Sequence, residues 1–123
     1  ALIDVLIADW CAEPTRVYST GMSNGGYFTT RLLCELGDRI AAGVSVAGLT
    51  HPDGCAPGRP VPLLAFHGTD DRILPPQSSE MVRFLAGAGE LVLLPGADHA
   101  LHPAGEEILA RLLTHLPEVL TAS

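Results

Sequence analysis

The chain has 123 residues, 47% hydrophobic and 17% charged, a balance that favours one globular domain over residues 1–123 and excludes a disordered chain. Seven Arg, no Lys and fourteen acidic residues give a net charge of −7, which repels nucleic acid and anionic membrane surfaces. The longest uncharged apolar run, residues 40–49, is shorter than the ~18 residues that cross a bilayer. We therefore expect neither nucleic acid nor a membrane as a partner.

The first third of the chain predicts a helix, a strand and a second helix. Apolar residues recur at helical spacing over the first dozen positions, namely Leu2, Ile3, Leu6, Ile7 and Trp10. We expect this amphipathic helix to end near Glu13–Pro14. The β-branched and aromatic segment 16–20 predicts a strand, and residues 27–36 predict a helix after the Gly-rich turn 21–26. Because the chain begins at Ala1, we expect it to be processed or cut from something longer.

Two apolar runs in the middle of the chain predict buried parallel strands. The runs Ala42–Ala47 and Val61–Phe66 are nearly continuous, so we expect both to be covered on two faces. The Gly- and Pro-rich segment 48–62 has no helical period. It predicts a long surface loop, with a crossover helix that is missing or very short.

Residues 78–94 predict a further helix and the last strand. Ser78 or Ser79 is a candidate N-cap for a helix over residues 80–86 that stops at Gly87, and Leu91–Leu94 predicts the fourth strand. The loop 96–102 comes next.

Pro103 is expected to open a last helix and Pro117 to end it. Its apolar residues are expected to face inward; they are Ile108, Leu109, Leu112, Leu113 and Leu116. Strands that alternate with helices predict an α/β fold of about four parallel strands. In such a fold, functional groups gather beyond the carboxyl ends of the strands.

The sequence Gly-Met-Ser-Asn-Gly has the pattern G-x-S-x-G between a predicted strand and a predicted helix, where this pattern marks a nucleophile. We expect Gly21 and Gly25 to be glycines because a Cβ at either position would collide with neighbouring backbone. The turn places Ser23 at the positive end of the helix and the Asn24 amide where an oxyanion would form. Met22 is a candidate for substrate binding.

A serine nucleophile needs a histidine base and a carboxylate that orients the histidine. Asp70 and Asp71 follow the third strand, and His99 and His102 follow the fourth. The order Ser, Asp, His is that of the α/β hydrolases, and a βα unit fits into each gap.

Three segments carry a family resemblance: Arg-Val-Tyr-Ser-Thr-Gly-Met-Ser-Asn-Gly-Gly-Tyr, the Arg-Leu-Leu-Cys-Glu that follows, and Pro-Val-Pro-Leu-Leu-Ala-Phe-His-Gly-Thr-Asp-Asp. They resemble the esterase branch of the α/β hydrolases, which contains polyhydroxybutyrate depolymerases and feruloyl or acetylxylan esterases. The resemblance implies a minimal α/β-hydrolase core that hydrolyses small or polymeric carboxylic esters through an acyl-enzyme, without a cofactor or metal. It implies Ser23 as nucleophile, Asp71 as triad acid in the pattern H-G-x-x-D-x-x-x-P, and His99 as base in a Pro-Gly-x-x-His loop.

The neighbouring polar residues receive other interpretations. Asp70 is interpreted as a loop or helix-capping carboxylate, and His102, just before Pro103, as part of the entrance to the last helix. His67 matches the strand-end His-Gly of the family and is expected to be a structural, hydrogen-bonded histidine.

Three further polar residues, His51, His115 and Asp98, are not assigned to the triad. His51 is a candidate for lining the substrate pocket, with a solvent-exposed role as the alternative. His115 is expected to interact with the carbonyl end of the last helix. Asp98 is expected at the surface.

The three cysteines, Cys11, Cys34 and Cys55, lack the CxxC spacing of a zinc site. The residues alone leave open one disulfide with one free thiol, or three buried thiols. The resemblance implies a disulfide between Cys34 and Cys55 with Cys11 free. It also implies secretion, although the given chain has no signal peptide.

Relatives of this kind have further strands before the first helix, and a His-Gly-Gly-type turn there supplies a second oxyanion amide. This chain has no such turn, so we expect a slow esterase or a donor from elsewhere. The alternatives are a non-catalytic core and a peptidase or thioesterase on the same triad. Without those strands, segment 16–20 leaves an open sheet edge, which predicts a homo-oligomer.

Overall fold

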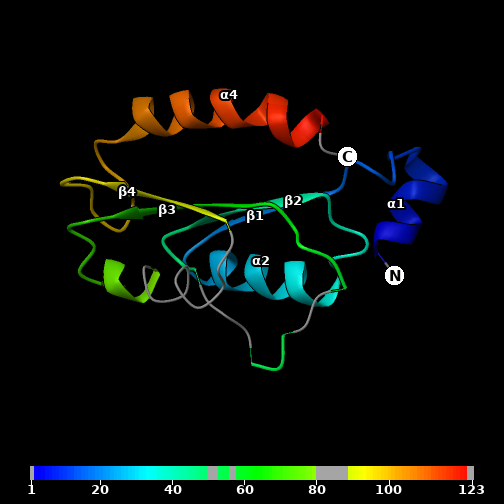
Figure 1. The fold of residues 1–123 in the computed structure, drawn as a ribbon, viewed down its shortest axis with the longest axis horizontal. Helices are drawn as coiled ribbons and strands as arrows, with labels where there is room; N and C mark the ends of the chain where they lie inside the picture. The colour runs from blue at the N-terminus through cyan, green and yellow to red at the C-terminus, as the bar shows by residue number, and fades with distance from the viewer. Residues whose placement is uncertain (1, 50–52, 56–57, 80–88, 122–123) are drawn as a thin grey trace.

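Four parallel strands form one sheet, and a helix covers each of its faces (Figure 1). The strands are β1 (Tyr18–Met22), β2 (Ala42–Val46), β3 (Leu63–Gly68) and β4 (Glu90–Leu94), in the order β1-β2-β3-β4. Helix α2 (Asn24–Glu35) lies on one face and α4 (Gly105–Thr121) on the other. The computed structural model describes residues 2–49, 53–55, 58–79 and 89–121, the last range without the side chains of 115–121. The predicted α/β fold of four parallel strands is confirmed.

The main hydrophobic core lies between the sheet and α4. Its buried members come from β3, β4 and the loop after β4: Leu64, Phe66, Val92, Leu94, Ala97 and Leu101. Ile108 and Leu112 of α4 pack against this cluster. Because burial of apolar surface stabilises a fold by about 25 cal/mol per Å², this core fixes β3 and β4 and the loops that leave them.

On the other face, α2 packs against β1 and β2. Gly43 leaves room for Leu33, since a Cβ at position 43 would lie 2.7 Å from Leu33 Cδ1. The hydroxyl groups of Ser19 and Thr29 form a 3.1 Å hydrogen bond between β1 and α2. The helix is therefore held directly over the strand that precedes it.

Helix α1 (Leu2–Trp10) lies at the periphery of the molecule (Figure 1). It ends earlier than predicted because the chain turns at Cys11, where φ is +54°. None of its residues, all of which the structure describes, is buried. An ion pair of 2.6 Å between Asp4 and Arg39 connects it to the rest of the chain. Its apolar side chains Leu2 and Trp10 are 71% and 76% exposed.

Strands β1 and β3 lie two residues further along the chain than predicted, whereas β2 and β4 agree to within one residue. The pairing explains the shift, because β1 stays in register with β2 up to the pair Met22↔Val46, and β3 stays in register with β4 up to Gly68↔Leu94. Tertiary pairing here overrides the low strand preference of Gly21 and Gly68.

For the last helix, the predicted first and last residues are wrong, and so is the predicted burial of two leucines. Helix α4 begins at Gly105 and continues past Pro117, although an interior proline removes one backbone hydrogen bond and disfavours a helix. Leu109 and Leu113 are 58% and 61% exposed, not inward-facing. The sheet covers the stripe of α4 that carries Ile108 and Leu112. The side chain of Leu116 lies outside the described residues.

The helix predicted over residues 80–86, with its stop at Gly87, also lies outside the described residues. The chain is already helical from residue 76 to 79, so Ser78 and Ser79 lie within a helix and the predicted N-cap is wrong. Pro76 is pre-organised for the first turn of a helix, which explains the earlier start.

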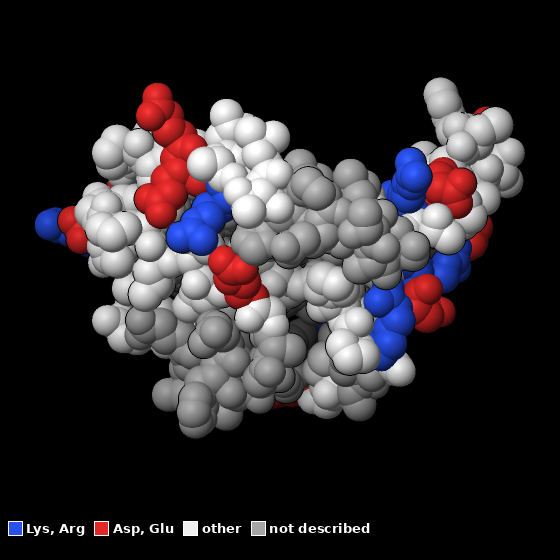
Figure 2. Space-filling view, turned by 45° about the horizontal axis from the view of Figure 1, so that its top comes forward, with Lys and Arg blue, Asp and Glu red and all other residues white. Residues whose placement is uncertain are grey.

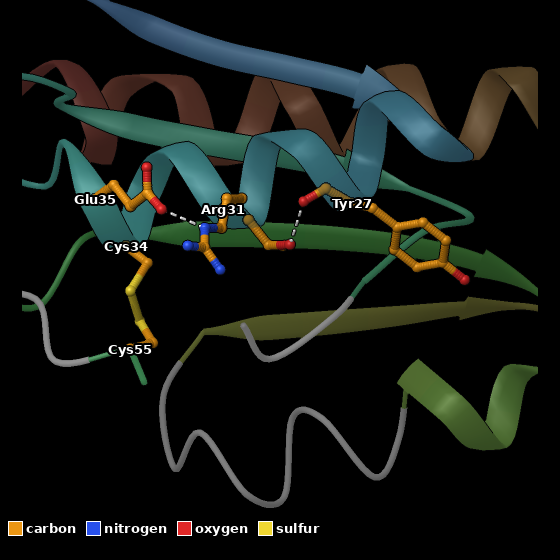
Figure 3. The surroundings of a disulfide bond; sticks show 6 residues. Tyr27, Arg31, Cys34, Glu35 and Cys55 are labelled. Carbon is orange, nitrogen blue, oxygen red and sulfur yellow. Dashed lines mark hydrogen bonds and ion pairs between the residues drawn. A yellow bond between two sulfur atoms is a disulfide. The ribbon is translucent and has the colours of Figure 1, made fainter. Parts of the chain in front are cut away.

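The loop after β2 contains no helix in its described residues and is anchored at two points. Arg59 donates to the carbonyl of Ile40 at 2.7 Å. A disulfide joins Cys34 of α2 to Cys55 of the loop, with the Cα atoms 5.6 Å apart (Figure 3). Cys11 is a free, exposed thiol.

On the surface, Arg side chains lie next to acidic ones on the face that carries α4 (Figure 2). One such pair joins Arg111 to Glu90 at 3.8 Å. No described helix is both long and apolar enough to span a membrane.

Candidate active site

Ser23 occupies the turn between β1 and α2 in a strained backbone conformation. Its φ and ψ are 54° and −117°, outside the regions that residues with a Cβ ordinarily adopt. The Ser23 N–H donates to the Val46 carbonyl at 2.8 Å, and the Ser23 carbonyl accepts from the Tyr27 N–H at 3.1 Å. A serine before a helix commonly caps it with its hydroxyl, but Ser23 forms no such bond to α2, so its hydroxyl is available to another partner.

Two close backbone contacts explain the glycines at this turn. A Cβ at Gly21 would lie 2.2 Å from the carbonyl oxygen of Gly25, and a Cβ at Gly48 would lie 2.1 Å from that of Ser23. The predicted steric reason for Gly25 is wrong, because nothing lies within 4 Å of a Cβ there. Gly26 carries that constraint instead, since a Cβ at this position would lie 2.8 Å from Ser45 Oγ. The sequence pattern does not single out Gly26 or Gly48.

The hydroxyl of Ser23 reaches a histidine from the far end of the chain. Ser23 Oγ lies 3.1 Å from His99 Nε2, and His99 Nδ1 lies 2.8 Å from Asp71 Oδ2. The three side chains follow β1, β4 and β3, whose carboxyl ends meet at one edge of the parallel sheet. The structure therefore brings together the three residues that the sequence selects as nucleophile, base and acid.

The loops that carry Asp71 and His99 are packed on each other. The Asp70 N–H donates to the Ala97 carbonyl at 3.0 Å, and the Gly96 N–H donates to Thr69 Oγ1 at 2.8 Å. A Cβ at Gly68 would lie 2.2 Å from the Ala97 carbonyl oxygen, so only glycine permits this approach. Close packing of the two loops fixes the distance between the carboxylate and the imidazole.

Asp71 is buried and its carboxylate is surrounded by donors. Oδ1 accepts the backbone N–H groups of Ile73 at 2.9 Å and Leu74 at 2.8 Å, and Oδ2 accepts His99 Nδ1–H. Burial alone raises the pKa of this carboxyl. The hydrogen bonds from His99, Leu74 and Ile73 outweigh burial and hold the pKa of Asp71 below its ordinary value. The side chain is therefore an anion that can orient His99 and stabilise its protonated form.

A second histidine contacts the same carboxylate. His67 is buried at the end of β3, and its Nε2 lies 3.1 Å from Asp71 Oδ2 and 2.7 Å from the Leu74 carbonyl oxygen. Its Nδ1 lies 2.7 Å from the hydroxyl of Ser79, which is also buried. The sequence predicts a hydrogen-bonded structural histidine at this position but does not predict its contact with Asp71 or the role of Ser79.

The first amide of α2 is available for an oxyanion. Asn24 begins the helix, so its backbone N–H has no carbonyl four residues earlier within the helix. It directly follows Ser23 and lies at the positive end of the helix, where a negative oxygen is stabilised.

The remaining candidates lie elsewhere. Asp70 is exposed, and its carboxylate accepts from Thr69 Oγ1 at 3.4 Å, not from a histidine. The His102 side chain is 80% exposed and lies 3.6 Å from Asp98. The Asp98 carboxyl also accepts the His102 backbone N–H at 3.0 Å, which lowers its pKa.

The sequence also predicts roles for Met22, His51 and His115. Met22 is 44% exposed beside Ser23. His51 lies outside the described residues, and so does the side chain of His115. Among the described residues, no cluster of three His, Cys, Asp or Glu side chains could hold a metal ion.

The strand order and the strained serine turn define an α/β-hydrolase fold. Solved structures share it: the crystal structure of Arabidopsis thaliana SOBER1 superposes with a TM-score of 0.78 at 23% identity, covering 97% of this chain and 60% of that one. No family model matches the chain.

Curated relatives give a more specific likeness. The chain is 36% identical over 69 residues to feruloyl esterase B of Piromyces equi, which covers 52% of this chain and 13% of that protein. It is 33% identical over 79 residues to the bifunctional acetylxylan esterase/xylanase XynS20E of Neocallimastix patriciarum, covering 64% of this chain and 12% of that protein. The chain therefore spans about an eighth of the length of these two relatives.

Proposed function

We propose that this chain is a serine esterase that hydrolyses carboxylic esters. The observation that carries the proposal is the hydrogen-bond series from Ser23 Oγ through His99 to Asp71, with distances of 3.1 and 2.8 Å. A serine hydroxyl is a weak nucleophile unless a base accepts its proton, and a carboxylate on the other ring nitrogen holds the base in the required tautomer. The relatives named as esterases support ester hydrolysis as the reaction.

The proposed reaction has two halves. Ser23 Oγ attacks the carbonyl carbon of the ester while His99 Nε2 takes the hydroxyl proton, and the Asn24 N–H stabilises the resulting oxyanion. The C–O bond to the alcohol then breaks, and the alcohol leaves with the proton from His99. Water attacks the acyl-Ser23 ester in the same manner, which releases the carboxylic acid and restores the Ser23 hydroxyl.

The substrate class that we propose is an acetyl or feruloyl ester on a polysaccharide such as xylan, because the relatives are named for feruloyl and acetylxylan ester hydrolysis. Polyester cleavage of the polyhydroxybutyrate type rests on the resemblance of the sequence motifs alone. A panel of methyl ferulate, acetylated xylan and short hydroxybutyrate oligomers separates these substrates. Preferred turnover of a thioester or peptide in the same panel would contradict the assignment as an esterase.

The direct test is covalent labelling with a fluorophosphonate together with turnover of p-nitrophenyl acetate. We expect the label on Ser23 and a loss of turnover of about 10³-fold or more in Ser23→Ala. Ser78→Ala is the matched control, because Ser78 is exposed and its hydroxyl donates to the Pro75 carbonyl. A folded protein that takes no label and turns over no ester would instead be a non-catalytic core.

A further inference from the structure

Two imidazole rings contact a single carboxylate oxygen in this site. Asp71 Oδ2 lies 2.8 Å from His99 Nδ1 and 3.1 Å from His67 Nε2. The side chains of His67 and Asp71 are 2% and 0% exposed, so their contact is shielded from water. The reaction proposed above uses His99 and Asp71 but assigns nothing to His67.

The hydrogen-bond partners determine which nitrogen of His67 carries a proton. Nε2 lies 2.7 Å from the Leu74 carbonyl oxygen, which can only accept, so Nε2 is protonated. Asp71 Oδ2 lies 3.1 Å from the same nitrogen, as a close polar contact beside this hydrogen bond. Nδ1 lies 2.7 Å from Ser79 Oγ, whose hydroxyl can donate to it. A neutral ring with its proton on Nε2 therefore satisfies both nitrogens.

The carboxylate of Asp71 therefore accepts three hydrogen bonds and has a fourth polar neighbour. Oδ1 accepts two backbone N–H groups, from Ile73 and Leu74, and Oδ2 accepts the N–H of His99 and lies 3.1 Å from His67 Nε2. A carboxylate with both oxygens engaged cannot rotate away from His99 without losing hydrogen bonds in a buried site, which is costly. Each additional donor also spreads the negative charge and weakens the hold of Asp71 on the protonated form of His99.

We propose that His67 is a positioning residue for the triad: it fixes the Asp71 carboxylate through Nε2–H, and Ser79 fixes the tautomer of His67. This role rests on the proposed esterase function. It adds His67 and Ser79 to the three side chains of the triad, with the 3.1 Å contact between His67 Nε2 and Asp71 Oδ2 as the link.

The expected effect of removing His67 is on catalysis and its pH dependence. In His67→Gln and His67→Leu, kcat for p-nitrophenyl acetate should fall roughly tenfold to a hundredfold, the range typical for outer partners that orient a functional group. KM should stay within about twofold, because His67 does not reach the surface. In His67→Leu, which has no donor, Asp71 should hold protonated His99 more tightly, so the acidic limb of the kcat/KM profile should move to higher pH.

Gln should retain more activity than Leu, because its amide can still donate an N–H. Ser79→Ala should give a smaller loss in the same direction, since it removes only the group that fixes the tautomer. His102→Gln is the matched control: this histidine is 80% exposed and pairs with Asp98, so all readouts should match the wild type.

Proton NMR of histidine labelled with ¹⁵N gives a readout that does not depend on activity. Two protected imidazole N–H signals are expected, one from His67 and one from His99. Asp71→Asn should shift both, and His67→Gln should remove the first and shift the second. Because this experiment needs no turnover, an inactive wild-type protein would contradict the proposed function without deciding the role of His67.

The proposal is overturned if folded His67→Leu and Ser79→Ala keep wild-type kcat, an unmoved acidic limb and an unchanged His99 signal. Circular dichroism establishes which variants are folded. If both His67 variants fail to fold, the kinetics and the His99 signal of Ser79→Ala decide the question, and wild-type values there overturn the proposal.

Discussion

At the scale of single residues, the Asp71 carboxylate organises the candidate site. It is buried, yet its pKa is lowered because hydrogen bonds to its charged form exceed the penalty of burial. The opposite situation occurs at Ser45, whose buried hydroxyl has no hydrogen-bond partner among the described residues. The ionised Asp71 carboxylate therefore raises the free energy of unfolding, whereas the Ser45 hydroxyl lowers it.

The depressed pKa of Asp71 predicts a pH dependence of stability. A carboxyl whose folded pKa is below its unfolded value stabilises the protein fully above the unfolded value. That contribution is lost as the pH falls from the ordinary value of 3.8 through the lower folded pKa. The free energy of unfolding, measured in urea between about pH 2 and 6, should therefore fall less steeply in Asp71→Asn. Equal slopes for the two proteins would contradict this.

Ser45→Ala should raise the free energy of unfolding by about 1 kcal/mol, since it removes a buried hydroxyl that gains no hydrogen bond on folding. Ser79→Ala provides the contrast, because Ser79 is equally buried but bonded to His67, and its loss should destabilise. Urea denaturation measures both. Destabilisation by Ser45→Ala would show that its hydroxyl has a partner.

At the scale of elements, the turn from β1 to α2 is constrained by backbone contacts. The two glycines of the turn differ in the room that they leave for a Cβ. A Cβ at Gly21 would collide with the carbonyl of Gly25, whereas a Cβ at Gly25 would meet nothing within 4 Å. Helix α2 is anchored at its other end by the disulfide between Cys34 and Cys55 (Figure 3). The helix that follows Ser23 is therefore restrained at both ends.

Gly21→Ala should abolish fluorophosphonate labelling, because a Cβ at 2.2 Å from the Gly25 carbonyl oxygen forces the turn apart. The expected loss of stability is about 1–3 kcal/mol, as for other overpacked sites. Gly25→Ala, with nothing within 4 Å, is the control and should be labelled like the wild type. Labelling of Gly21→Ala at the wild-type rate would show that the turn can adapt.

The disulfide should also be measurable in solution. Denatured, unreduced protein should contain one reactive thiol, that of Cys11, and reduction should raise the number to three. Cys34→Ser with Cys55→Ser should lower the free energy of unfolding by roughly 2–4 kcal/mol, since the bond closes a loop of moderate length. Three thiols before reduction would contradict the pairing.

At the scale of the whole molecule, the sheet ends at β1, whose outer edge is unpaired in the described residues. Next to it in sequence, α1 exposes Leu2, Val5, Leu6 and Trp10. Unpaired strand edges and exposed apolar side chains favour association with another chain.

We accordingly predict that this chain forms a homodimer or a larger closed oligomer, in which β1 edges or α1 faces meet across a two-fold axis. Light scattering at micromolar concentration should give at least twice the monomer mass of 12.9 kDa. A charge on the edge strand, as in Thr20→Lys, should weaken the association. A stable monomer with full esterase activity would overturn this prediction.

The sequence predicts the fold because each buried strand is an apolar run and each turn has its own residue signature. It predicts Ser23, Asp71 and His99 because each follows a strand, and a parallel sheet brings those ends together. It does not predict the contact between His67 and Asp71, which joins the end of β3 to the turn after it and has no periodic signature. Leu109 and Leu113 are misplaced because the apolar pattern of α4 is wider than the stripe that the sheet covers.

The loop after β2 differs from those after β1, β3 and β4, because none of its described side chains belongs to the hydrogen-bond series of the site. Among its described residues, Gly48 lies against the serine turn, and Cys55 and Arg59 anchor the loop further on. We expect substitutions at the exposed residues 53 and 54 of this loop to leave Ser23, Asp71 and His99 in place. The exposed described residues of this loop are consequently candidate positions for introducing sequence diversity into the scaffold.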